Sequence, residues 1–139
     1  MKKLLFLLSL FLLTVNCSTQ KTATNPTKDK QPMQAQKDDD GEYDLVVFDT
    51  EYNYYLAAIA RPMMTYSEEY LKSRNRFLAT EWNNYYSANR YPNIIESSID
   101  YDPNINYGLK YEYKLFQVFN YVRWKYGLRM SGISQADMR

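Results

Sequence analysis

A polar segment from Ser18 to Gly41 limits what this chain can fold into. The segment is rich in Thr, Gln, Lys, Asp, Asn and Pro, contains no aromatic residue and shows no apolar periodicity. Such a stretch cannot bury enough apolar surface to order itself, so we expect a disordered tether over residues 17–41. Residues 42–133 then remain to form a core, and a domain of this size buries only roughly 60% of its unfolded surface. The chain therefore predicts one small globular domain, followed by a tail over 134–139.

The folded part predicts an α+β arrangement. An apolar run with β-branched residues over 44–49 is typical of a buried strand, and an apolar alternation over 94–101 indicates a second strand. Capping residues, apolar periodicity and prolines mark the remaining elements. They predict helices from Asp49 or Thr50 to Ala58, from Ser67 to Asn89 and from Tyr107 to Tyr126 with Gly127 at its end, and a short third strand over 128–133. The expected architecture is two long helices packed on a small two- or three-stranded sheet.

Tyrosine is unusually frequent in this chain. All fifteen tyrosines lie between Tyr43 and Tyr126. Tyrosine joins a large apolar ring to a polar tip and is enriched at interfaces. The main interpretation is that the rings cover a thin core while their hydroxyls reach water. The alternative is an exposed aromatic surface that contacts sugars or proteins.

Two aromatic residues of the last predicted helix form a candidate binding patch. Tyr121 and Trp124 are spaced i, i+3 on the side away from the apolar stripe of that helix. If both are exposed, they would bind a ligand or a partner. The main interpretation is that they pack under the tether or under the helix over 50–58, and the exposed patch is the minor one. Trp82 lies on the apolar stripe of its own helix and is expected in the core.

Oxygen-bearing side chains alternate over 100–106 as they do in the first half of a calcium loop: Asp100, Asp102, Asn104 and Asn106. Ile105 stands where such a loop needs glycine, and Tyr111 stands where its closing acid belongs. A Pro-Asn turn explains the same residues, because Asp and Asn side chains bond to nearby backbone in turns. The turn is the main interpretation and calcium a minor one. No other metal and no cofactor is expected.

Composition excludes several kinds of chemistry. The chain has no histidine, one cysteine and four glycines, which removes His-based nucleophile pairs, the usual zinc sites and Gly-rich phosphate loops. Apart from Lys2 and Lys3, 15 Lys and Arg face 16 acids, so there is no electrostatic footprint for nucleic acid. Carboxylates remain as candidates for hydrolysis, although no pattern makes two of them converge: Glu68, Glu69, Glu81 and Glu96.

Residues 1–16 have the pattern of a secretory signal peptide. Lys2 and Lys3 precede an apolar stretch of about twelve residues, whereas a membrane-spanning helix needs roughly 20. Cys17 follows, and the region resembles the lipobox of bacterial lipoproteins. The resemblance implies cleavage before Cys17, lipidation of its thiol and firm membrane anchoring. Ser18, in place of an acid, implies the outer membrane. Residues 14–16 depart from the usual lipobox, so cleavage elsewhere and a soluble secreted protein is the alternative.

Several motifs occur in a family-like order. They are the lipobox, the polar tether, YDLVVFD over 43–49, TEWN over 80–83, DYDPNINYG over 100–108 and a tyrosine-rich last helix. In this order the chain is similar, over nearly its whole length, to a family of small bacterial lipoproteins of unknown function. The resemblance implies a location and a single small domain. It supplies no activity and no catalytic residues.

These features predict a lipid-anchored protein of the cell envelope. We expect its domain to be a non-catalytic protein-interaction or structural module. A glycan-binding module with exposed aromatic residues is the second interpretation, and a small carboxylate-dependent hydrolase is the third. The expected partners are the membrane, through Cys17, and an envelope protein or glycan, with no nucleic acid.

Overall fold

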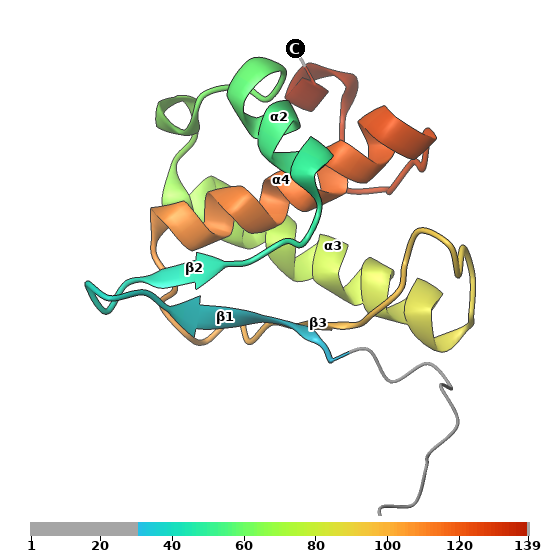
Figure 1. Cartoon of the computed structure of the whole chain (residues 1–139), viewed down its shortest axis with the longest axis horizontal. Helices are drawn as coiled ribbons and strands as arrows, with labels where there is room; N and C mark the ends of the chain where they lie inside the picture. The colour runs from blue at the N-terminus through green and yellow to red at the C-terminus, as the bar shows by residue number, and fades with distance from the viewer. Residues whose placement is uncertain (1–30, 139) are drawn as a thin grey trace, which may run out of the picture.

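The structure, a computed structural model, describes residues 31–138. The expected signal peptide, the lipidation site at Cys17 and the tether up to residue 30 lie outside this described part. Within it, a small sheet lies along one side and the helices gather over it (Figure 1). The predicted α+β class is confirmed.

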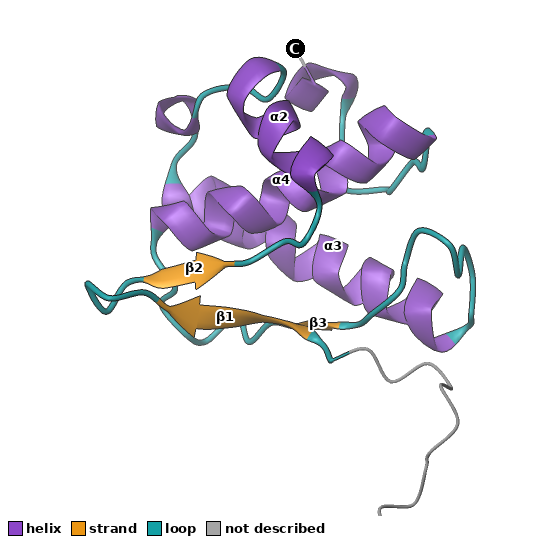
Figure 2. Cartoon of the chain, in the orientation of Figure 1, coloured by secondary structure: helices purple, strands orange, loops and turns teal. Residues whose placement is uncertain are grey.

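The first two helices begin at the capping residues that the sequence offers. α2 (Thr50–Ala58) begins after Asp49, whose carboxylate accepts an N–H of the first turn at 2.9 Å. α3 (Glu68–Ser87) begins after Ser67, whose hydroxyl accepts an N–H of its first turn at 3.2 Å. Each cap satisfies a backbone donor that has no partner inside the helix. Both predicted helices are confirmed (Figure 2).

The third helix ends at a glycine. α4 (Leu109–Tyr126) stops where Gly127 adopts a φ of 69°, a left-handed conformation that glycine tolerates without strain. The predicted helix over 107–126 is thus confirmed, although it begins two residues later than expected. α3 and α4 pack against each other, and α2 lies on α4.

The sheet has three short strands in the order β2-β1-β3. β1 (Met33–Lys37) pairs antiparallel with β2 (Tyr43–Leu45) and parallel with β3 (Ile99–Asp100). The β1–β2 ladder ends at the pair Ala35 and Leu45. The central strand is therefore the one closest to the N-terminus of the described chain.

β1 corrects the expected start of the domain at residue 42. Residues 33–37 belong to the predicted tether, yet they form the central strand. Met33 and Ala35 are half-buried, whereas Gln34 and Gln36 are exposed. The strand contains no β-branched residue, so its conformation comes from pairing on both sides and not from local preference.

The other predicted strands are shorter than expected or absent. The run over 44–49 is a strand only to Leu45, and the run over 94–101 is a strand only at its end. Before that end, the N–H of Ile95 bonds to the carbonyl of Tyr91 at 2.8 Å, which makes a turn. Residues 128–133 bury three apolar side chains but make no strand. Apolar runs this short do not distinguish a strand from a buried turn.

Aromatic side chains build much of the core. Trp82 is 2% exposed, packs edge-to-face on Phe119 and donates from its indole N–H to the carbonyl of Ser97 at 2.8 Å, which confirms its expected place. All the tyrosines lie in the core or pack against it except Tyr54, Tyr91 and Tyr126. The rings therefore cover a core as expected, but many hydroxyls donate to protein groups, as those of Tyr52 and Tyr113 do at 2.7 and 2.9 Å, and do not reach water.

The predicted tail over 134–139 is in part folded. The segment ends in a short 3-10 helix, η3 (Gln135–Met138). A similar 3-10 helix, η2 (Met63–Thr65), lies between α2 and α3. Asp137 is 6% exposed and accepts from the hydroxyls of Tyr70 and Ser134. Because these bonds satisfy a buried carboxylate, the C-terminal segment is part of the domain.

Candidate functional site

Tyr121 and Trp124 do not form an exposed patch together. Tyr121 is 4% exposed, and its ring lies beneath α2 at 5.5 Å from the Tyr52 ring. Trp124 is 37% exposed and lies 5.4 Å from the ring of Tyr55. This geometry agrees with the main interpretation, packing under the helix over 50–58, and not with the exposed patch. The cause is that α2 folds back over the last helix.

The calcium candidates are arranged as a turn. Asp102 accepts from the backbone N–H and from the side-chain amide of Asn104, each at 2.9 Å. Asp100 lies in β3, and Asn106 is exposed beyond the turn. Within residues 31–138, no three His, Cys, Asp or Glu side chains are grouped to hold a metal. The Asx-turn interpretation accounts for Asp102 and Asn104.

The carboxylates proposed for hydrolysis have separate surroundings. Glu68 and Glu69 lie in the first turn of α3, where the helix dipole favours acids. Glu81 accepts from the N–H and the hydroxyl of Ser131 and from the hydroxyl of Tyr85. It therefore ties α3 to the C-terminal segment.

Glu112 is a buried carboxylate that the sequence did not single out. It is fully buried on α4 and accepts from the side-chain amide of Asn75 at 2.7 Å and from the hydroxyl of Tyr101. Burial raises its pKa above the ordinary value, although both donors oppose this rise. No cavity that we describe reaches it, so it belongs to the core.

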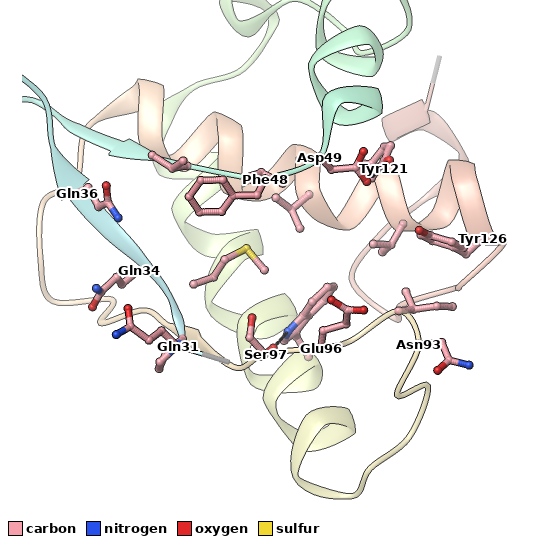
Figure 3. A pocket seen from close by; sticks show the side chains of 18 residues that line it. Gln31, Gln34, Gln36, Phe48, Asp49, Asn93, Glu96, Ser97, Tyr121 and Tyr126 are labelled. Atoms are coloured by element: carbon pink, nitrogen blue, oxygen red, sulfur yellow. Dashed lines mark hydrogen bonds between the residues drawn. The ribbon is translucent and has the colours of Figure 1, made fainter. Parts of the chain in front are cut away.

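The structure forms a cleft of about 640 Å³ where β2 leaves the sheet (Figure 3). One wall is the segment over 46–49, and the other consists of 31–34 and 93–97. The apolar floor includes the buried side chains Trp82, Val118 and Val122 from α3 and α4. This volume is in the ordinary range of ligand sites, roughly 300–1,000 Å³.

The wall over 46–49 is held at both ends. At its start, Asp44 forms an ion pair with Lys114 of α4 at 2.6 Å. At its end, Asp49 caps α2, accepts from the Tyr121 hydroxyl at 2.7 Å and pairs with Lys125 at 3.1 Å. These contacts hold the segment against α4 and away from β1. The segment over 46–49 is therefore tied to α4 on both sides of the cleft.

Apolar side chains are exposed on this wall. Phe48 is 97% exposed and Val46 is 43% exposed, while Val47 between them is half-buried. Figure 3 places Phe48 at the edge of the cleft, across from the glutamines of β1. An exposed aromatic ring beside an apolar floor is typical of an interaction surface.

The charged residues that line the cleft are both acids, Asp49 and Glu96. The hydrogen bond from the Tyr121 hydroxyl, aided by Lys125, holds the pKa of Asp49 below its ordinary value despite partial burial. A general acid needs a raised pKa, so Asp49 does not suit that role near neutral pH. The Asp49 carboxylate is thus already neutralised by Lys125.

Comparison with known proteins places this domain in a family. A family model matches residues 5–138. The chain belongs to DUF6146, a family of unknown function. No curated protein and no solved structure matches this DUF6146 member. None of the helices within residues 31–138 has the length and apolarity needed to span a bilayer.

The segment over 44–49 carries a sequence signal for this cleft. In the DUF6146 segment DLVVFD, both alternating faces are apolar, with Leu45 and Val47 on one face and Val46 and Phe48 on the other. A strand that is apolar on both faces needs cover on both. Within the described chain α4 covers one face, so the second face indicates a docking surface.

Proposed function

We propose that this protein is a lipid-anchored component of the bacterial cell envelope, in the outer membrane, and that its domain is a non-catalytic docking module. The anchor rests on the signal-like leader and on Cys17, the only cysteine of the chain. The family match begins at residue 5, so the leader and the tether belong to the sequence that the family shares. A tether of this composition behaves as a flexible chain and lets the domain reach partners near the membrane.

One observation carries the docking function: Phe48 is 97% exposed at the edge of an apolar cleft. Burying a phenylalanine side chain is worth roughly 1.5–3 kcal/mol, so a partner that covers Phe48 gains that contact. The cleft is also held open before any partner arrives, through the contacts of Asp44 and Asp49 with α4. A preformed site avoids part of the entropic cost of binding.

The chemistry of the lining favours binding over catalysis. Its polar side chains are mainly amides, including Gln31, Gln34 and Asn93. Of its two acids, Asp49 is held ionised by Tyr121 and Lys125. This lining holds neither a nucleophile with an adjacent base nor a metal ligand set, so its chemistry suits binding.

The membrane anchor is tested by metabolic labelling with a palmitate analogue in the native cells. We expect label on the wild-type protein and its recovery in the outer-membrane fraction. The Cys17→Ala variant should carry no label and leave that fraction. Equal labelling of the two, or wild type in the soluble fraction, contradicts the anchor.

The docking site is tested by photo-crosslinking in intact cells. A photoreactive amino acid replaces Phe48 in one strain and Phe77, which is 65% exposed on α3, in a matched control strain. We expect a defined crosslinked protein at position 48 that is absent at position 77. The same products at both positions, or none at position 48, contradict docking at the cleft. A product that glycosidases remove would favour the glycan-binding interpretation.

A further inference from the structure

Two rows of side chains lie next to each other on the outer face of the sheet at the cleft. Continuing the β1–β2 register by one residue sets Gln34 opposite Val46. Side chains that lie directly opposite each other, or two residues apart on one strand, point to the same face. Val46 and Phe48 therefore form an apolar row beside an amide row of Gln34 and Gln36. All four side chains are exposed and line the cleft (Figure 3).

The amide side chains of the lining are free to bind a ligand. Four of them are exposed around the cleft: Gln31, Gln34, Gln36 and Asn93. None of these side chains has a hydrogen-bond partner within residues 31–138. Each amide presents two N–H donors and a carbonyl acceptor. A matching ligand therefore needs groups that both donate and accept, as hydroxyls do.

The cleft offers no uncompensated charge that would select an ion. Its two charged residues are Asp49 and Glu96. Asp49 pairs with Lys125 at 3.1 Å, and Glu96 has an interaction of its own. A charged group that entered the cleft would lose water without gaining a free counter-ion. The lining therefore favours a neutral ligand.

We infer that the cleft binds a neutral glycan chain of the cell envelope. This inference deepens the docking function and rests on it. A sugar ring has a face of C–H groups and a rim of hydroxyls. The C–H face packs on the ring of Phe48, whose π face is slightly negative, and the hydroxyls exchange hydrogen bonds with the amide row. Because the apolar row and the amide row are neighbours, one sugar ring contacts both.

Other occupants match these two rows less well. An added peptide strand needs an open backbone edge, but the residue before β1 is Pro32, which has no N–H. The hydrocarbon of a bilayer would cover Phe48, but it would also remove water from the exposed amides without offering them partners. A nucleic acid needs cations, and the residues that line the cleft include no Lys or Arg.

The test in solution uses the mature protein, in micelles of a detergent without a sugar headgroup, and soluble neutral hexasaccharides of glucose, mannose and N-acetylglucosamine. We expect saturable binding of at least one of them, with shifts of the Gln34 and Gln36 side-chain amide signals in NMR spectra. Phe48→Ala should bind it at least about tenfold more weakly, and Gln34→Ala about two- to tenfold. Phe77→Ala is the matched control and should bind like wild type.

Salt separates this binding mode from an ionic one. Raising the salt from about 0.1 M to about 1 M should leave the affinity unchanged, because no ion pair contributes to binding. In cells, chemical deglycosylation of the crosslinked product at position 48 should lower its mass. Release of a protein would then identify a glycoprotein as the source of the glycan, and release of sugar alone would identify a polysaccharide.

Three results would overturn the glycan proposal. They are no saturable binding of any hexasaccharide, equal binding by wild type and Phe48→Ala, and loss of binding at high salt. Self-association of the protein that Phe48→Ala abolishes would assign the cleft to a second copy instead. If the product at position 48 is unchanged by deglycosylation, the docking function stands and only the glycan assignment fails. If no crosslink forms there, the docking function itself fails.

Discussion

The Tyr121 hydroxyl donates to the carboxylate of Asp49 over 2.7 Å, which joins α4 to the N-terminus of α2. Both residues line the cleft. The bond links residues 72 positions apart and fixes the point where the segment over 46–48 turns into a helix. One interaction thus holds a cleft wall, begins a helix and lowers the pKa of Asp49.

Tyr121→Phe removes this bond and keeps the ring under α2. We expect the free energy of unfolding to fall by about 1.5–3 kcal/mol, because a hydrogen bond to a charged group contributes in that range. Tyr54→Phe is the matched control, since Tyr54 is 60% exposed on α2. Urea denaturation of the two variants measures the difference. A Tyr121→Phe protein as stable as Tyr54→Phe would show that the bond does not hold the cleft wall.

Phe48→Ala should separate binding from folding. Phe48 is 97% exposed, so its removal should change the free energy of unfolding by less than about 0.5 kcal/mol. Leu45→Ala, three residues earlier and 2% exposed, should cost about 2–5 kcal/mol. Thermal unfolding compares the two. A large loss in Phe48→Ala would mean that Phe48 serves the core and not a partner.

Glu112→Gln tests the buried carboxylate through pH. The folded state raises the pKa of Glu112 above its ordinary value of 4.5, so the folded protein holds this proton more tightly than the unfolded chain. The stability from Glu112 is full below the ordinary pKa and is lost as pH rises through the folded pKa. Wild type should therefore lose stability relative to Glu112→Gln as the pH rises above the ordinary pKa of 4.5. A pH-independent difference in unfolding free energy would contradict this.

Gly132→Ala tests the packing of the C-terminal segment on α3. A Cβ at Gly132 would lie 2.9 Å from Cδ2 of Leu78, a fully buried side chain. Such overpacking costs roughly 1–3 kcal/mol. In the double variant with Leu78→Ala the added methyl fills part of the new cavity, so the loss should be smaller than the sum of the two single losses. Strict additivity in denaturation experiments would contradict this contact.

The helices were predictable because their signals are local. Asp49 and Ser67 begin their helices through side-chain caps, and Gly127 ends its helix through a positive φ. The strand β1 was not predictable, because MQAQK has little β preference and becomes a strand only between β2 and β3. Long-range pairing overrides local preference at that position.

The candidate site was less predictable than the fold. Spacing alone left Tyr121 either on a patch or packed under another helix, because spacing does not show which helix folds over another; in the structure α2 covers it. The cleft depends on where the β1–β2 ladder stops. That point is set by two segments about ten residues apart in the chain, and its floor comes from α3 and α4. The one local sign was the doubly apolar segment over 45–48.

Hydrogen exchange of the free mature protein tests the open cleft most directly. We predict that the amides of Gln34, Val47 and Phe48 exchange almost as fast as in an unstructured peptide. The amides of Gln36 and Asp44, which face each other in the ladder, should be strongly protected. Equal protection of the two groups would show that β2 continues its pairing through Phe48 and that the cleft is closed in the free protein.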